Sequence, residues 1–338
     1  MTIFIVIIGI SLLILIHEFG HFLIAKKMGL LVEEFGFGFP PRLFSKKLGE
    51  TTYSLNLLPF GGFVKIFGED SGGQIPEESK MRSFSHQPAW KRALIIVAGV
   101  LMNFLLGWFL MSIIFMIGTP KALLIAEVLP GSPAEIVGIM PQDQILGFEK
   151  AGDFIDFVNK NRGEEIALSI NRGGEELSFK VIPRVEGEGA VGVSLVEAGV
   201  DKKPFLDAIW EGLKTAGFIV FAIFGAFLNL IWGFLTQGKV LVDFVGPIGI
   251  FGVASQAGSL GFLYLVQLIA MISLNLTVLN IFPFPALDGG RLLFVLIEKI
   301  KGSPLSQNFE RTANTAGFIL LLLAMIAITV RDITRLFL

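Results

Sequence analysis

Four long apolar runs along the chain predict helices that cross a membrane. They cover Thr2–Ala25, Ala93–Ile117, about 260–282 and about 316–330. A helix as long as the first run rises about 36 Å, whereas the hydrocarbon core of a bilayer is about 30 Å thick. The basic pair Lys26 and Lys27 follows the first run, whereas a cleaved signal peptide carries its basic residues in front. We therefore expect the first helix to be retained in the membrane.

The charges between the runs predict how the helices are oriented. Lys26–Arg92 carries 10 basic and 7 acidic residues, whereas Gly118–Pro204 carries 9 basic and 14 acidic ones. Because lysine and arginine collect in short cytoplasmic loops, we expect the first segment in the cytoplasm and the second outside it. The N-terminus is then also outside, and the basic loop after about residue 282 is cytoplasmic.

A fifth apolar run, Phe205–Leu235, is harder to place. If the run at 260–282 crosses inward, another crossing by Phe205–Leu235 would put the basic loop around Arg291 and Lys299 outside. We therefore expect the fifth run to lie in the membrane interface or to re-enter the membrane without crossing it. Hydropathy alone supports a fifth full span nearly as well, so this alternative stays open.

The stretch Gly118–Pro204 differs from the rest of the chain in its pattern. Polar and charged residues alternate with Val, Ile and Phe, and glycine is frequent. This pattern is typical of a small soluble domain made of short strands with one or two helices.

Composition narrows the classes of function. Of the 338 residues, 53% are hydrophobic and 17% are charged, whereas soluble domains have about 25% charged residues. This argues against a soluble enzyme and against a disordered chain. The formal net charge of -2 gives no indication of nucleic-acid binding. The chain has no cysteine, so a metal would have to be held by His, Asp or Glu, and only three histidines are present.

Two of the three histidines, His17 and His21, lie within the first apolar run in an H-E-F-G-H pattern. Residues four apart share one face of a helix, so both imidazoles can bind one tetrahedral zinc ion. Glu18 beside them can act as a general base toward zinc-bound water. The pattern can also occur by chance, but ionisable groups at membrane depth are costly and usually functional. His86 lies in a polar loop, where we expect it to be solvated.

A catalytic zinc ion usually has three protein ligands and one open position. Asp288 is the most unusual carboxylate, because it follows the third apolar run and the two prolines Pro283 and Pro285. The prolines break the helix, and such a loop is tolerated at membrane depth if it lines a cavity. Taken alone, Asp288 is better explained as a cap of the next helix. Because a two-histidine site needs a third ligand, we favour the metal role.

The chain resembles the site-2 protease family, and most closely its bacterial regulator-of-sigma-E protease type. The resemblance covers nearly the whole chain and rests on the H-E-F-G-H helix, the later N-x-x-P-x-P-x-L-D-G motif and the domain between them. It implies an intramembrane zinc metalloprotease of the bacterial cytoplasmic (inner) membrane, with its active site toward the cytoplasmic side. It also implies that His17, His21 and Asp288 bind Zn2+ and that Glu18 is the catalytic base.

The resemblance extends to a membrane-associated β-hairpin near the active site, which Thr51–Lys65 matches. By pattern, this segment predicts two short strands around Pro59–Gly62, and Phe35–Phe39 resembles a further piece of the same sheet. An exposed strand edge can hold an extended peptide by strand addition, although a plain hairpin is the alternative. The residues expected to contact substrate are Gly61, Gly62, Asn275 and Asn280. Helix packing, or capping of the broken third span, is the alternative role of the two asparagines.

The region from about Leu123 to Arg184 resembles a PDZ domain of the circularly permuted bacterial kind. Val128–Ala134 and Gly138–Leu146 carry this resemblance, with Gln142 where the pattern usually has glycine. Peptide binding and exclusion of bulky substrates are both open as roles of this domain.

The predicted fold is a polytopic α-helical membrane protein with about four transmembrane helices, a membrane-associated β-hairpin and one extracytoplasmic PDZ-like α+β domain. We expect an N-terminal membrane core at 1–117 (hairpin at about 33–67, second span at 93–117), a PDZ-like domain at 118–200, a membrane-associated segment at 201–259 and a C-terminal membrane core at 260–338.

The predicted function is cleavage, within the lipid bilayer, of single-pass transmembrane proteins that a site-1-type protease has trimmed first. In the family this releases a signalling fragment, such as an anti-sigma factor domain, or clears signal peptides. A metal transporter would need ligands along other spans, yet the second and fourth runs have no charged interior residue. A catalytically silent scaffold would lack Glu18 or a ligand, and all are present. We expect no nucleic acid among the partners.

Overall fold

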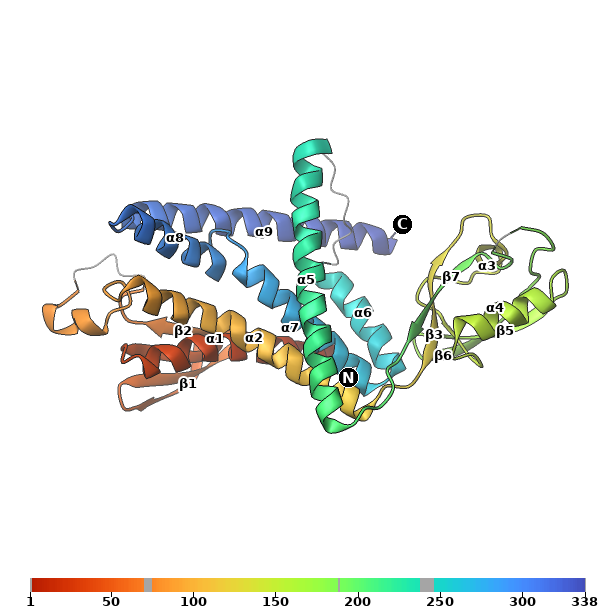
Figure 1. Ribbon diagram of the computed structural model, residues 1–338, viewed down its shortest axis with the longest axis horizontal. Helices are drawn as coiled ribbons and strands as arrows, with labels where there is room; N and C mark the ends of the chain where they lie inside the picture. Colours follow the sequence, from red (N-terminus) through yellow and green to blue (C-terminus); the bar gives the residue numbers. More distant parts are fainter. Residues whose placement is uncertain (1, 70–74, 188, 238–245, 338) are drawn as a thin grey trace. The chain divides into compact units, whose positions relative to one another are not determined.

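The computed structural model describes residues 2–69, 75–187, 189–237 and 246–337 and divides into two compact units. The first unit comprises Met1–Met111, Gly212–Phe251 and Leu268–Leu338, and the second comprises Ser112–Glu211 and Gly252–Gln267. Most of the described residues are helical, as Figure 1 shows. The predicted segment 201–259 includes residues 238–245, which lie outside the described residues.

Five helices in the described part of the chain are long and apolar enough to cross a membrane. They are α1 (Thr2–Lys27), α2 (Ala89–Ile117), α5 (Phe205–Gln237), α7 (Phe262–Ile281) and α9 (Gln307–Phe337). Only 6% of the most apolar stretch of α9 is buried within the protein. Such an apolar surface is expected to contact lipid, since soluble proteins rarely expose so large a patch. The architecture is that of a polytopic membrane protein.

The apolar run at 205–235 forms one unbroken helix, α5, of 33 residues. A re-entrant loop needs a break in the helix, and no proline occurs between Phe205 and Gln237. An unbroken helix gives no support to re-entry, whereas a position in the membrane interface and a full span both stay open as predictions. The charge argument counted no further element before the next span, but a short helix, α6 (Pro247–Leu260), follows α5.

Two long strands, β1 (Val32–Leu48) and β2 (Thr51–Ile66), form a sheet that follows α1 (Figure 1). Gly49 lies in the turn between the strands, with a φ of +64° that glycine adopts without strain. The sequence predicts that the chain turns around Pro59–Gly62. The pairing register agrees with this prediction, because residues 52–55 run parallel to 34–37 whereas residues 62–65 run antiparallel to them, so β2 reverses direction between these two stretches.

Both long strands change direction along their length, so one stretch of β1 pairs with two separate stretches of β2. Residues 34–37 of β1 pair with 62–65 of β2 on one side and with 52–55 on the other. The segment around Phe35 is therefore part of the same sheet, as predicted, and it lies between two stretches of β2. In this register, residues 62–66 form an edge of the sheet, next to residues 32–37 of β1.

The sheet packs against α1 close to its histidines. The Ser11 hydroxyl donates a hydrogen bond to the carbonyl of Pro59, one and a half turns before His17. A side chain added at Gly61 or Gly62 would contact Ile14 or Leu15, so these glycines bring the strand close to the helix. Further along α1, the ring of Phe22 packs against the rings of Phe35 and Tyr53 in the sheet.

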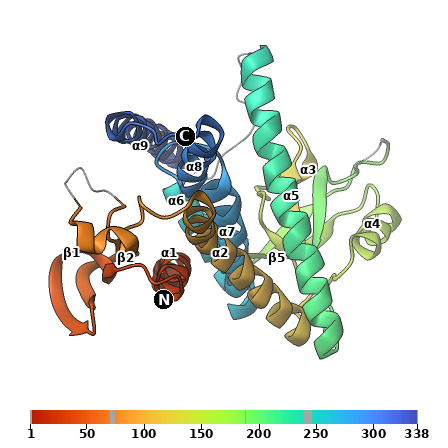
Figure 2. The same ribbon diagram turned by 60° about the vertical axis from the view of Figure 1, so that its left-hand side comes forward.

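Three helices of the first unit, α1, α2 and α7, pack through glycines and lie side by side in Figure 2. A side chain at Gly20 of α1 would meet the backbone of Ala98 in α2. Side chains at Gly9 and Gly107 would meet Ile269 and Leu274 of α7. Small residues let helix backbones approach closely, which is how helices associate in a lipid environment.

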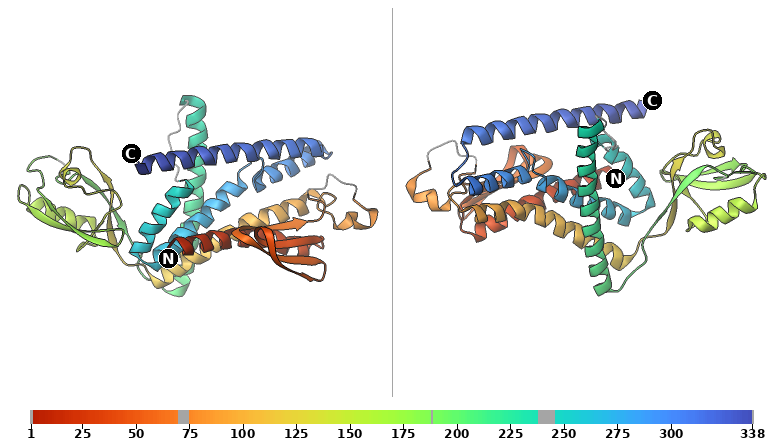
Figure 3. Two further views of the ribbon diagram at one scale, coloured as in Figure 1. Left: turned by 180° about the vertical axis from the view of Figure 1, so that it is seen from behind. Right: turned by 45° about the horizontal axis from the view of Figure 1, so that its top comes forward.

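The end of the chain is a helical pair, α8 (Asp288–Lys301) and α9, joined after Gly302. Gly302 ends α8 in the left-handed conformation, and α9 then turns back beside α8, as Figure 3 shows. The rings of Phe294 and Phe309 are 6.0 Å apart across this pair. Arg92 of α2 forms an ion pair with Glu298, which ties α8 to α2.

The second unit contains a five-stranded sheet with the strand order β6-β5-β4-β3-β7. The strands are β3 (Ala122–Val128), β4 (Gln144–Ile145), β5 (Ile166–Arg172), β6 (Glu175–Val181) and β7 (Val193–Ala198), and the helices beside them are α3 (Pro133–Ile136) and α4 (Ala151–Lys160). Apolar residues from all five strands and both helices form its core. This is the mixed domain expected between Gly118 and Pro204, whereas its likeness to a PDZ domain and the predicted domain limits stay predictions.

Acid pH is expected to weaken the turn that joins β1 and β2. Arg82 and Lys26 bond the Glu50 carboxylate at 2.7 Å and 2.9 Å and lower its pKa from 4.5 to about 2. A lowered pKa stabilises the fold above pH 4.5, and this contribution disappears as the pH falls toward 2. Glu50→Gln should cost about 1 kcal/mol or less at pH 7, because the three side chains are about one-third exposed or more.

The measurement is unfolding of the detergent-solubilised protein at pH 7 and at pH 2. The difference between Glu50→Gln and the wild type should shrink at the lower pH. Glu77→Gln is the control, since its ion pair with Lys80 is 85% exposed on the glutamate side and should matter little. A difference that persists unchanged at pH 2 contradicts this account.

Candidate metal centre

Helix α1 places His17 and His21 on one face, one turn apart, inside a membrane-length helix. Their Nε2 atoms are 3.2 Å apart, and both residues are more than nine-tenths buried. The two rings meet edge to face, with centroids 4.8 Å apart. The i, i+4 spacing that predicts a metal site thus brings two nitrogen donors to one point.

Asp288 reaches the same point from the other end of the chain. Its Oδ2 lies 3.0 Å from Nε2 of His17 and 3.2 Å from Nε2 of His21. The chain breaks between α7 and α8, where Ala286 has a φ of +75° and donates its N–H to the side chain of Asn314. This break turns the first residue of α8 back toward α1.

The alternative role of Asp288 as a helix cap has no support in the local geometry. The cap position of α8 is Leu287, and no side chain makes a capping hydrogen bond there. The Oδ2 atom of Asp288 is buried and accepts no hydrogen bond from the residues that the structure describes. Its neighbours are instead the two imidazole nitrogens.

The three donors fit a zinc ion. Among the described residues, His17, His21 and Asp288 form the group of three possible ligands whose donor atoms converge within 4.8 Å. Nitrogen and oxygen ligands of a tetrahedral zinc ion are about 3.3–3.5 Å apart, close to the separations found here. A cation among them would also stabilise the buried carboxylate oxygen that lacks a hydrogen bond.

Helix α2 lies behind the two histidines and contacts both. The carbonyl of Ile95 is 2.8 Å from Nδ1 of His21, so it accepts the Nδ1–H and leaves Nε2 free to bind a metal. One turn further along α2, a side chain at Gly99 would meet Nε2 of His21 and lie 2.8 Å from Cε1 of His17. Glycine at this position therefore leaves space for the imidazoles.

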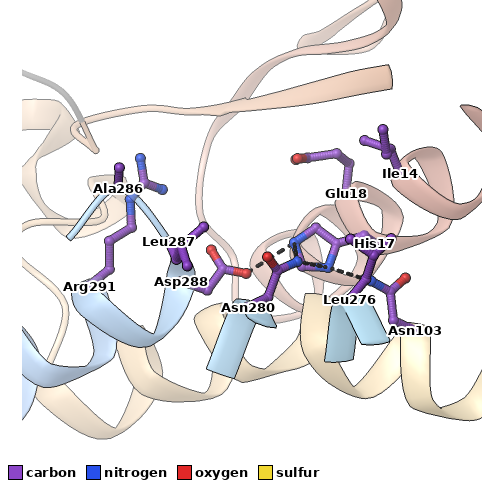
Figure 4. Close-up of a pocket in the computed structure, with 10 residues that line it drawn as sticks. All are labelled: Ile14, His17, Glu18, Asn103, Leu276, Asn280, Ala286, Leu287, Asp288 and Arg291. Carbon is purple, nitrogen blue, oxygen red and sulfur yellow. Dashed lines mark hydrogen bonds and ion pairs between the residues drawn. The ribbon is translucent and has the colours of Figure 1, made fainter. Parts of the chain in front are cut away.

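A cavity of about 360 Å³ opens beside two of the donors, His17 and Asp288, which Figure 4 shows among its lining residues. The residues that line it are Ile14, His17, Glu18, Asn103, Leu276, Asn280, Ala286, Leu287, Asp288 and Arg291. Glu18 borders this cavity and is only partly buried, so a general base beside the donors can reach water or a bound peptide.

A second cavity of about 220 Å³ reaches the donors past the sheet. Glu18, His21 and Asp288 line it together with Phe63, Val64 and Ile66 of β2. Both cavities therefore reach Glu18 and Asp288, and the second one connects them to β2.

The four residues expected to contact substrate differ in their surroundings. Asn280 lines the first cavity, and its Nδ2 is 3.4 Å from both ring nitrogens of His17. Asn275 is exposed and is not among the residues that line either cavity, since positions five apart on α7 point about 140° apart. Gly61 and Gly62 are buried against α1. Their contacts with substrate stay predictions.

The sequence also carried signals for residues that the prediction missed. Asn103 lies at the centre of the apolar run of α2, where an amide is costly unless it has a partner, and Gly99 precedes it by one turn. Arg291, one turn after Asp288, lines both cavities and bonds Glu69 at 2.5 Å. His86 is exposed, as expected, and is not part of the donor group.

Known proteins resemble this chain over nearly its whole length. The profile of Peptidase family M50 matches residues 5–324. A relative from Clostridium perfringens, assigned by name to the zinc metalloproteases, is 34% identical over 98% of both chains. Zinc metalloprotease RasP of Oceanobacillus iheyensis is 30% identical over 97% of both chains. The matched residues include all three donors and Glu18.

Adding one methyl group at Gly99 should lower the zinc content of the purified protein severalfold, because the new Cβ occupies the space of the imidazoles. The matched control is Gly225→Ala in α5, where an added Cβ meets nothing within 4 Å. Metal analysis and the elution profile of each detergent-solubilised variant provide the measurement. Equal zinc content in well-folded Gly99→Ala and Gly225→Ala would contradict the packing account.

Proposed function

Because the chain belongs to Peptidase family M50 and is a zinc metalloprotease, we propose that it cleaves membrane proteins inside the bilayer. One observation carries this proposal. The donor atoms of His17, His21 and Asp288 converge on a helix long enough to cross a membrane, with His17 about 15 Å from its cytoplasmic end. Peptide bonds that reach these donors therefore lie within the membrane.

The proposed reaction assigns a role to each residue near the donors. His17, His21 and Asp288 hold zinc, which when bound acts as a Lewis acid toward water and the scissile carbonyl. Glu18 takes a proton from the attacking water and delivers it to the amine that leaves. Asn280 lines the first cavity, where its side-chain amide would hydrogen-bond the substrate.

The substrate we propose is an extended peptide from a single-pass transmembrane protein. A helical peptide hides its backbone, so it must unwind before its amide bond is accessible. Phe63, Val64 and Ile66 of β2 line a cavity that Glu18 also lines, and pairing with this strand would keep the peptide extended. Gly61 and Gly62 bring this part of β2 against α1, which supports their role in placing the substrate.

We propose that α1, α2, α5, α7 and α9 cross a bacterial cytoplasmic membrane and that the chain passes back through it once more between α5 and α7, with the N-terminus and the 118–200 domain outside. In this arrangement α5 crosses inward, and the chain returns through the 14-residue α6 before α7 crosses inward again. The basic residues after α7 then stay in the cytoplasm, so this path agrees with both the length of α5 and the charge distribution. The PDZ-like domain would meet substrates outside, after a site-1-type protease has shortened them.

The mechanism predicts that Glu18→Gln binds zinc like the wild type but loses cleavage by about 10²-fold or more. The assay uses purified protein in detergent micelles and a single-pass substrate with a short extracytoplasmic part. Glu127→Gln, at an exposed position of the second unit, is the control and should keep full activity.

A second variant separates the general base from the metal ligands. Asp288→Asn should lose zinc and activity together, whereas Glu18→Gln should lose only activity. Equal cleavage by Glu18→Gln and the wild type would overturn the proposed mechanism, and full zinc content in Asp288→Asn would remove Asp288 from the ligand set.

The absence of cysteine makes the proposed topology directly testable. Single-cysteine variants are made at Asp201, before α5, and at Thr236, near its end, both exposed positions. A membrane-impermeant maleimide applied to intact cells should label Asp201→Cys. It should label Thr236→Cys only after permeabilisation, like a control at Lys46 in the predicted cytoplasmic sheet. Labelling of Thr236→Cys in intact cells would show that α5 does not cross.

A further inference from the structure

Asn103 is a fully buried polar residue that the proposed mechanism does not use. It lies midway along α2, about 21 Å from either end of the helix, and is 0% exposed. A buried amide at such a depth is costly unless its oxygen and nitrogen find partners. The side-chain partner that the structure gives it is His17, since Nδ2 of Asn103 lies 3.3 Å from Nδ1 of that ring.

The carboxamide oxygen of Asn103 has no hydrogen-bond partner among the described residues. In this orientation the amide nitrogen of Asn103 faces Nδ1 of His17, so Nδ1 would have to accept a hydrogen bond from the amide N–H. The ring proton would then be on Nε2, the atom closest to Asp288. That tautomer cannot bind a metal through Nε2. A half-turn of the carboxamide exchanges its two ends, which have the same shape, and brings the oxygen to Nδ1.

We propose that Asn103 is a positioning residue for the zinc ligand His17, whose Nδ1–H it accepts through its side-chain oxygen. This hydrogen bond places the ring proton on Nδ1 and directs an unprotonated Nε2 toward the metal. The inference rests on the proposed zinc site.

A comparison with His21 supports this role. Ile95, Gly99 and Asn103 are spaced by four along α2, so they share one face of that helix. The carbonyl of Ile95 accepts from Nδ1 of His21, Gly99 leaves space for both rings, and the amide of Asn103 faces Nδ1 of His17. One face of α2 thus provides an orienting group for each histidine of α1.

The backbone around Asn103 is held in place from the other side. The hydroxyl of Ser273, on α7, donates to the carbonyl of Asn103 at 2.8 Å, and both residues are fully buried. Because α7 also carries Asn280, the His17 ring has an amide near it from α2 and another from α7, as Figure 4 shows. Asn280 is only partly buried, which leaves Asn103 as the enclosed, fixed partner.

The test measures zinc affinity of the full-length protein in detergent by competition with a chelator. Asn103→Leu should weaken zinc binding about 10–100-fold and change the absorption spectrum of the cobalt-substituted protein, which reports ligand geometry. Asn103→Asp keeps an acceptor at this position and should restore most of the affinity. Asn229→Leu, at an exposed position of α5, is the matched control and should bind zinc normally.

Each outcome decides the question. Wild-type affinity and spectrum in Asn103→Leu would overturn the proposal, as would equal defects in folded Asn103→Leu and Asn103→Asp. If Asn103→Leu does not fold, Asn103→Ala takes its place with the same expectations. Full zinc binding by His17→Ala would instead show that the zinc site itself is wrong, which separates the failure of the proposed function from the failure of this inference.

Discussion

The structure depends on the cost of placing ionisable groups inside a membrane helix. Two imidazoles and a carboxylate gather at about membrane depth, with donor atoms 3.0–3.2 Å apart. Unpaired polar groups there cost several kcal/mol, so every neighbouring element must either provide a partner or leave space for one. A bound zinc ion would satisfy the three donors together, and the surrounding helices would determine how well they are held.

The packing of α1 follows from this requirement. On one side, α2 offers a carbonyl to His21 and an amide to His17, and Gly99 keeps the space between them open. At the other end of the chain, the prolines after α7 interrupt the helix, so that Asp288 can point back to α1. A continuous helix at this place would direct the carboxylate along a different face.

A protease site must also admit a peptide. Both cavities reach Glu18, and one of them runs past residues 63–66 of β2. The sheet is tied to α1 by Ser11 and by the close approach of Gly61 and Gly62. A strand held beside a catalytic helix offers backbone groups to an extended peptide, which a bundle of helices alone could not do.

The sequence alone predicts the chemistry proposed for this protein, because spacing on a helix and cost at membrane depth are local properties. His17, Glu18 and His21 are predicted by an i, i+4 pattern, and Asp288 by the resemblance of its proline-rich motif together with the need for a third ligand. The path of the chain was less accessible, since the charge argument counted no element between the run at 205–235 and the next span, where the structure has the short helix α6. Only the tertiary structure decided which distant groups meet. It brought the side chain of Asn103 next to the ring of His17 and left Asn275 exposed. Such contacts depend on how neighbouring helices are rotated against each other, which the sequence pattern of a single helix does not determine.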